Sequence, residues 1–131
     1  ITPNIPETEA LTGMQIRGRK DMEQAARLLY QNWGCQVLCK GGHLPDSADD
    51  LLFTKEGALW IEGKKVDNPN THGTGCTLSS AIAGGLALGL ELSEAVCRAK
   101  EYLTGALEAG LDLGKGSGPL NHMYRQKAEN A

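Results

Sequence analysis

The stretch "NTHGTGCT" at residues 70–77 leads directly into a run in which no side chain is charged, Thr77–Leu90. The run is shorter than a membrane span and is rich in Gly, Ala and Ser. Small side chains let a helix approach its neighbours closely. The run therefore predicts a packed helix that begins at the glycines and ends near Gly89.

Two glycines, Gly73 and Gly75, stand at the expected start of this helix. Glycine permits positive φ and lets backbone N–H groups approach a ligand. A Gly-x-Gly turn that opens into a helix presents unpaired N–H groups beside the positive end of the helix dipole, where phosphate binds readily. The stretch fits neither the P-loop pattern nor G-x-G-x-x-G. Taken alone, it favours a structural turn and an anion site equally.

Cys76 falls in the first turn of the expected helix. The helix dipole there favours a thiolate, which would accept a proton from a hydroxyl that attacks a bound phosphate. Cysteine is also a common small apolar residue beneath a helix. The residue pattern leaves both interpretations open.

Strand and helix patterns alternate along the chain, which predicts an α/β fold with a parallel sheet and one β-hairpin. Residues 1–4 read as the end of a strand, and residues 35–40 as a buried strand parallel to it. The hairpin is expected between residues 51 and 66. Cys35 and Cys39, four residues apart on the second strand, are expected to be core thiols.

Helix boundaries follow from capping signals. A short helix is expected from Pro6 to Gly13, with Glu7 in its first turn. A second is expected from Asp21, as N-cap of a capping box with Gln24, to Gly34. Ser93 is expected to cap a last helix. Trp33 and Trp60 are expected to pack in the core or against the hairpin.

Composition limits the function. The chain has 131 residues and a formal net charge of −3, with basic side chains scattered among acidic ones. The charge argues against a nucleic-acid partner, the short uncharged run Thr77–Leu90 argues against a membrane partner, and the length favours one domain. The four cysteines form no C-x-x-C pair and no zinc-ligand spacing with the histidines. Free thiols in a reducing cytoplasm are therefore expected.

Three stretches, "ITPNIPE", "KGGH" and "NTHGTGCTLSSAIA", together resemble the hydroxymethylpyrimidine and phosphomethylpyrimidine kinases of thiamine biosynthesis, in the ribokinase-like superfamily. The resemblance covers nearly the whole chain and ends in a late G-x-G-P-x-x-H. Most superfamily members have aspartate after the Gly-x-Gly; cysteine there is typical of the pyrimidine kinases and of a similar pyridoxal kinase branch. The resemblance implies a ribokinase-like fold and the use of ATP and Mg²⁺.

The resemblance also implies roles for individual residues. The family's anion hole, which stabilises charge on the transferred phosphoryl group, matches Gly73, Thr74, Gly75 and Cys76. Cys76 matches the catalytic base. His72 could contact phosphate or orient the turn.

Further matches imply a nucleotide site. Asn4 and Glu7 match an N-x-x-E pair near the magnesium and phosphates of ATP, with Glu7 acting on the metal indirectly. The nucleotide-binding end of a central strand matches Lys40, Gly41 and Gly42. The segment from Val66 to Thr71 would line the adenine side.

Family members are about twice as long as this chain, so residues 1–131 resemble the C-terminal, nucleotide-binding half. The missing N-terminal half would supply most of the pocket for a pyrimidine alcohol or its phosphate. We expect the chain to be inactive alone, and to self-associate where that half is missing. The alternatives are a pyridoxal kinase of the same branch and a non-catalytic nucleotide-binding module.

Overall fold

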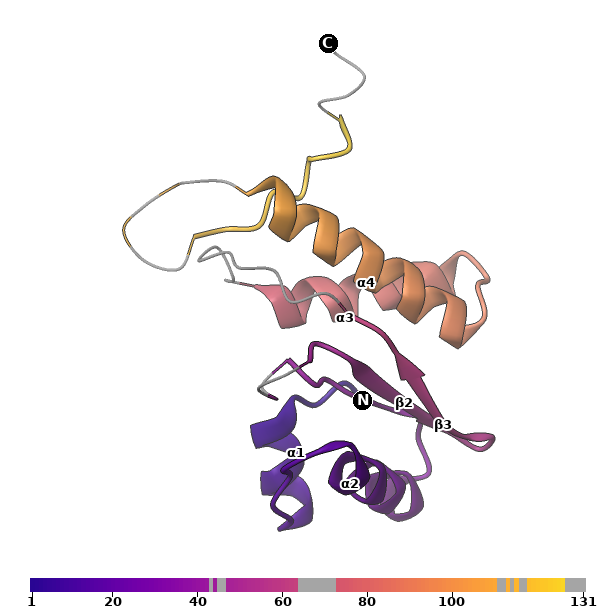
Figure 1. Cartoon of the computed structure of the whole chain (residues 1–131). Coiled ribbons are helices and arrows are strands. Elements are labelled where there is room, and N and C mark those ends of the chain that lie inside the picture. The colour runs from indigo at the N-terminus through magenta and orange to yellow at the C-terminus, as the bar shows by residue number, and fades with distance from the viewer. Residues whose placement is uncertain are drawn as a thin grey trace. The chain divides into compact units, whose positions relative to one another are not determined.

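The computed structural model describes residues 1–42, 44, 47–63, 73–110, 113, 115 and 118–126. The chain divides into two units, Ile1–Lys65 and Val66–Ala131. The first holds α1, α2 and the strands β1–β3; the second holds α3 and α4 (Figure 1). Among the described residues, no helix is long and apolar enough to cross a membrane.

Helix α1 spans Ile5–Thr12, as its sequence signals predict. Asn4 and Glu7 form a reciprocal capping box: Asn4 Oδ1 accepts the Glu7 N–H and Glu7 Oε2 accepts the Asn4 N–H, each at 2.8 Å. Gly13 ends the helix in the left-handed conformation, with φ of 71°. The N-x-x-E pair therefore has a structural role at the start of α1.

Helix α2 spans Arg19–Trp33 and ends at Gly34, which is left-handed as predicted. Its predicted start at Asp21 is wrong, because the helix begins two residues earlier with Gly18 at the N-cap. Asp21 instead lies in the first turn, where its carboxylate accepts the Arg17 N–H at 2.9 Å. An acidic residue in this turn complements the helix dipole without being the cap.

The strands β1 (Val37–Cys39), β2 (Asp50–Thr54) and β3 (Gly57–Ile61) form an antiparallel sheet in the order β1-β2-β3. The predicted hairpin is confirmed as β2–β3. Outside the hairpin a parallel sheet was expected, and there the pairing of β1 with β2 is antiparallel instead. Only ten residues connect β1 to β2, too few for the crossover that parallel neighbours need, so the chain returns antiparallel.

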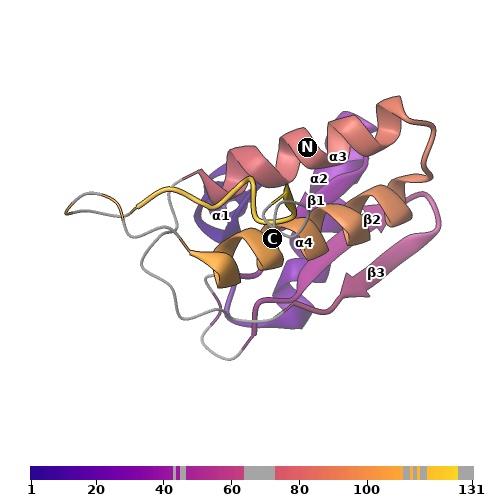
Figure 2. The same cartoon turned by 90° about the horizontal axis from the view of Figure 1, so that it is seen from above.

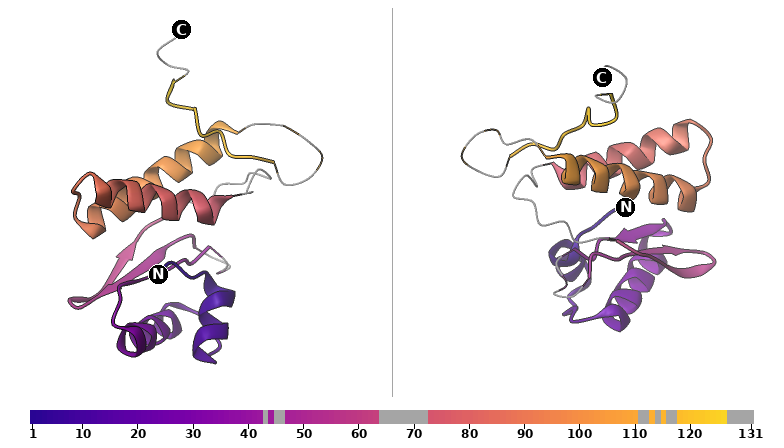
Figure 3. Two further views of the ribbon diagram at one scale, coloured as in Figure 1. Left: turned by 180° about the vertical axis from the view of Figure 1, so that it is seen from behind. Right: turned by 45° about the horizontal axis from the view of Figure 1, so that its top comes forward.

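A parallel pairing does occur along the other edge of β1. The Leu38 N–H donates to Ile1 O at 2.8 Å, the Lys40 N–H donates to Pro3 O at 2.9 Å, and Asn4 forms a parallel bridge with Lys40. The expectation that residues 1–4 run parallel to the strand near residue 38 is therefore confirmed. In Figure 3 the N-terminus lies next to the strands of the first unit.

Helix α2 packs on one face of the sheet in the first unit, and α1 packs against α2. The apolar cluster there includes Met22, Ala25, Ala26, Leu29, Val37, Cys39, Leu51 and Phe53. Trp60 packs against this cluster and donates its indole N–H to Glu23 at 2.7 Å. Trp33, the last residue of α2, is 51% exposed, so its predicted core position is wrong.

Helices α3 (Thr74–Ala87) and α4 (Leu92–Ala109) form a hairpin in the second unit, side by side in Figure 2. Their close approach needs a glycine: a Cβ at Gly85 would lie 3.0 Å from the Ala95 Cβ. The prediction of a closely packed small-residue helix is confirmed. Helix α4 begins at Leu92 with Glu91 at the N-cap, so the predicted cap at Ser93 is wrong.

Candidate functional site

The start of α3 has the geometry that the glycine pattern predicts. Gly73 is left-handed, with φ of 81°, and α3 begins at the next residue, Thr74. The first backbone bond of the helix runs from the Thr77 N–H to Gly73 O at 2.9 Å. The N–H groups of Thr74, Gly75 and Cys76 therefore have no partner within the helix, and they lie at its positive end.

Cys76 is the third residue of α3 and is exposed. This excludes the interpretation of Cys76 as a residue packed beneath the helix. Cys97, on α4, is the other exposed cysteine among the described residues. Cys76 thus places an accessible sulfur in the helical turn that carries the free N–H groups.

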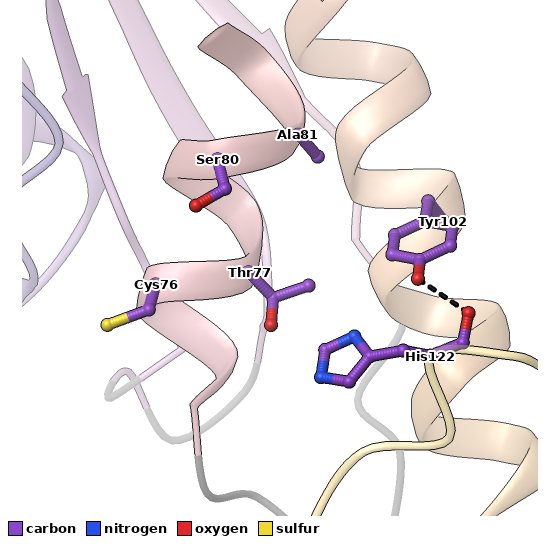
Figure 4. A pocket seen from close by; sticks show the side chains of 6 residues that line it. All are labelled: Cys76, Thr77, Ser80, Ala81, Tyr102 and His122. Carbon is purple, nitrogen blue, oxygen red and sulfur yellow. Dashed lines mark hydrogen bonds between the residues drawn. The ribbon is translucent and has the colours of Figure 1, made fainter. Parts of the chain in front are cut away.

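A pocket of about 530 Å³ begins at this turn and continues along α3 (Figure 4). Its lining residues are Cys76, Thr77, Ser80, Ala81, Tyr102 and His122. The side chains of Thr77 and His122 point toward one another across it, whereas the Cys76 sulfur points away from α4. The volume is in the range of small-molecule sites.

The far wall of the pocket comes from α4 and from the chain after it. The Tyr102 hydroxyl donates to the backbone O of His122 at 2.8 Å. The Asn121 N–H donates to Ala106 O at 3.3 Å, and Leu120 is buried. These contacts fix residues 120–122 along α4.

A second group of predicted site residues lies in the first unit. Lys40 is half-buried at the end of β1 and bridges to Asn4, which in turn caps α1 with Glu7. The parallel pairing at the edge of β1 thus brings Asn4, Glu7 and Lys40 together, as the resemblance implies for one site.

Gly41 is constrained both by a hydrogen bond and by close packing. Its N–H donates to the buried Asp50 carboxylate at 2.9 Å, and a Cβ here would overlap the carbonyl oxygen of Asp49. At Gly42, by contrast, a Cβ would meet nothing within 4 Å. Gly41 is therefore required by packing, whereas nothing in the fold requires glycine at position 42.

Cys39 differs from Cys76. Its sulfur is buried and lies 3.0 Å from the Thr8 hydroxyl. Burial raises the pKa of the Cys39 thiol above its ordinary value of 9.0, and the Asp50 carboxylate raises it further, against the opposite effect of the Thr8 hydrogen bond. The prediction of a core thiol is confirmed for Cys39. It is wrong for Cys35, which is half-buried and precedes the strand.

The remaining predictions concern the adenine side and the metal. Val66, Thr71 and His72 lie outside the described residues. Within the described part of the chain, no three His, Cys, Asp or Glu side chains are grouped to hold a metal ion. One Glu7 oxygen already accepts the Asn4 N–H. Glu7 is therefore better suited to contact a metal through water than to coordinate it directly.

Sequence reasoning missed two features of these groups. Asp50 stands just before the hairpin expected between residues 51 and 66, yet it begins β2 and its carboxylate is buried against Gly41. Tyr102 and His122 are twenty residues apart, and only the return of the chain along α4 joins them. The late G-x-G-P-x-x-H was the one signal for His122.

Comparison with known proteins gives a consistent family. The sequence model of the phosphomethylpyrimidine kinase family matches residues 1–121. The chain is 46% identical over 121 residues to the hydroxymethylpyrimidine/phosphomethylpyrimidine kinase of Streptomyces coelicolor. The aligned region covers 92% of this chain and 45% of that protein. The chain thus spans about half the length of the curated relatives it matches.

Solved structures show the same similarity. An ADP complex of Bacillus subtilis pyridoxal kinase superposes with a TM-score of 0.88 at 36% identity, over 96% of this chain and 50% of that one. The phosphomethylpyrimidine kinase of Clostridium difficile superposes with a TM-score of 0.66 at 42% identity, over 79% of this chain and 40% of that one. The fold is therefore ribokinase-like.

Proposed function

The chain belongs to the phosphomethylpyrimidine kinase family, and we propose on that basis that it is the nucleotide-binding and catalytic half of a small-molecule kinase. The reaction is transfer of the γ-phosphoryl group of ATP to a pyrimidine alcohol, hydroxymethylpyrimidine, and then to its monophosphate. One observation carries this proposal: the left-handed Gly73 starts α3 so that free N–H groups and the accessible Cys76 share one turn.

The start of α3 is suited to phosphoryl transfer. The transferred group carries charge on its equatorial oxygens, so catalysis depends mainly on positioning and on electrostatic stabilisation. In our proposal, the N–H groups of Thr74, Gly75 and Cys76 donate to those oxygens. The α3 dipole adds favourable potential for the negative charge.

Cys76 is proposed as the base. The substrate hydroxyl oxygen forms a bond to the γ-phosphorus while the bond from that phosphorus to the β,γ-bridging oxygen breaks, and ADP leaves. The Cys76 thiolate takes the hydroxyl proton. A loose transition state leaves that proton on the oxygen until late, so a weak base is sufficient.

Residues of the first unit are proposed to bind nucleotide phosphate and the metal. Lys40 would supply positive charge to its phosphates, with Gly41 and Gly42 beside it. Mg²⁺, which usually keeps several waters in such sites, would neutralise phosphate charge. Asn4 and Glu7 would contact it through those waters. Val66 and Thr71 remain proposed residues of the adenine side.

A pyridoxal kinase activity is the second candidate. The similarity to the Bacillus subtilis pyridoxal kinase favours it, because that enzyme shares this fold at 36% identity. In the resemblance, the residues that distinguish pyrimidine from pyridoxal belong to the half of the kinases that this chain does not match. We favour the pyrimidine substrate because the matching family model and the Streptomyces coelicolor relative are both named as pyrimidine kinases.

A chimera tests the catalytic half directly. The first half of the Streptomyces coelicolor kinase, placed before residues 1–131, is expected to form ADP in the presence of ATP, Mg²⁺ and hydroxymethylpyrimidine. The 131 residues alone are expected to form none, because most of the alcohol pocket is missing. A folded but inactive chimera would contradict the proposal, as would pyrimidine-dependent ADP formation by the 131 residues alone.

A further inference from the structure

The pocket along α3 has a polar wall that the proposed reaction does not use. His122 is exposed, and its imidazole is directed across the pocket toward Thr77 (Figure 4). Exposed side chains usually sample several positions, so a fixed imidazole needs support from its backbone. That support comes from α4.

Contacts with α4 and within the chain that follows it hold the backbone around His122. The Tyr102 hydroxyl donates to His122 O at 2.8 Å, and the Asn121 N–H donates to Ala106 O at 3.3 Å. The rings of Tyr102 and Tyr124 lie 5.7 Å apart, with the Arg125 guanidinium over both. The His122 N–H also donates to Leu120 O at 3.1 Å, so among these contacts the Tyr102 hydroxyl is the side-chain group that bonds to His122 itself.

The position of the pocket relative to the phosphate site indicates what it receives. The free N–H groups end at Cys76, and the pocket continues from Cys76 and Thr77 to Ser80 and Ala81, one turn further along α3. For a nucleotide whose phosphates lie at the start of α3, this pocket is within reach of the nucleoside. The pocket has room for one, and three hydroxyls, from Thr77, Ser80 and Tyr102, line it together with the His122 imidazole.

We propose that His122 contacts the nucleoside part of the bound nucleotide and that Tyr102 is its positioning residue. The inference rests on the proposed nucleotide-binding function. The Tyr102 hydroxyl fixes the backbone at His122 and so keeps the imidazole at the far wall of the pocket. Tyr102 itself acts through His122 and not on the ligand.

Isothermal titration of the 131-residue chain with AMP-PCP tests the contact. Loss of one hydrogen bond weakens binding about tenfold, so His122→Ala is expected to raise the Kd for AMP-PCP by that factor. His122→Gln, which keeps a donor and an acceptor, is expected to restore most of it. Binding of inorganic tripolyphosphate, which has no nucleoside, is expected to be unchanged in His122→Ala.

A double-mutant cycle tests the role of Tyr102. Tyr102→Phe removes only the hydroxyl and is expected to raise the Kd for AMP-PCP several-fold. The matched control, Tyr124→Phe, removes the hydroxyl that accepts from Arg125 Nε at 3.1 Å and is expected to leave the Kd unchanged. In the His122→Ala background, Tyr102→Phe is expected to have no further effect, because coupled residues are not additive.

The outcomes separate this inference from the proposed function. If the wild-type chain binds AMP-PCP and His122→Ala binds it equally well, the inference is wrong and the function stands. If His122→Ala weakened the binding of AMP-PCP and of tripolyphosphate equally, His122 would contact the phosphates, and the inference would again be wrong. Additive effects of the two substitutions would remove Tyr102 from the proposal. If the wild-type chain binds neither ligand, function and inference both fail.

Discussion

Replacing Cys76 by alanine is expected to lower the turnover number of the chimera by about 10²–10⁴-fold, the range for loss of a general base. The sulfur lies in the turn that carries the free N–H groups of α3, so it is close to any hydroxyl that attacks a phosphoryl group bound there. The KM for ATP is expected to change little, because the backbone donors remain. Steady-state ADP formation measures both quantities.

Cys97→Ala is the matched control for this substitution. Cys97 is also exposed and lies in the same unit, but it does not line the pocket. Its replacement is expected to leave turnover unchanged. Near-normal turnover in Cys76→Ala would show that the sulfur is not the base, whatever the loop binds.

The second large effect is expected at Gly41, on stability. Gly41→Ala places a Cβ against the carbonyl oxygen of Asp49, and the backbone has to move to accept it. Such overpacking costs about 3 kcal/mol in the free energy of unfolding. Both tryptophans, Trp33 and Trp60, belong to the first unit, so fluorescence during urea denaturation follows that unit.

Gly42→Ala is the matched control. It tests whether the loss of stability comes from the close packing at Gly41 or from any side chain placed after Lys40. A Cβ there meets nothing within 4 Å, so the free energy of unfolding is expected to change by less than about 0.5 kcal/mol. Equal urea midpoints for the two variants would mean that the close approach of Gly41 to Asp49 is absent in solution.

Local sequence signals predicted the elements well where a single residue determines the backbone. Gly13, Gly34 and Gly73 all adopt the left-handed conformation at the helix ends where the sequence places them. Caps that depend on a side-chain oxygen were less predictable. Asp21 and Ser93 are good N-cap residues, yet the helices begin earlier, at Arg19 and Leu92, because a cap residue is also acceptable inside a first turn.

Pairing and burial depend on contacts that are distant in the sequence. The antiparallel order of β1, β2 and β3 follows from the short connection before Asp50, which composition does not reveal. The candidate site shows the same limit. One stretch of sequence is enough to predict the glycines and Cys76 as site residues. The far wall of the pocket instead depends on a contact between Tyr102, on α4, and His122, in the chain that returns along α4.

The accessibility of Cys76 tests most directly the central claim that the start of α3 binds nucleotide phosphate. Iodoacetamide labelling of the 131-residue chain, followed by mass spectrometry, gives the alkylation rate of Cys76 with Cys97 as the internal reference. At ten times its Kd, AMP-PCP is expected to slow alkylation of Cys76 by roughly tenfold, while Cys97 reacts at its original rate. Adenosine, which has no phosphate, is expected to protect neither. An unchanged Cys76 rate with saturating AMP-PCP, or equal protection by adenosine, would contradict the phosphate site.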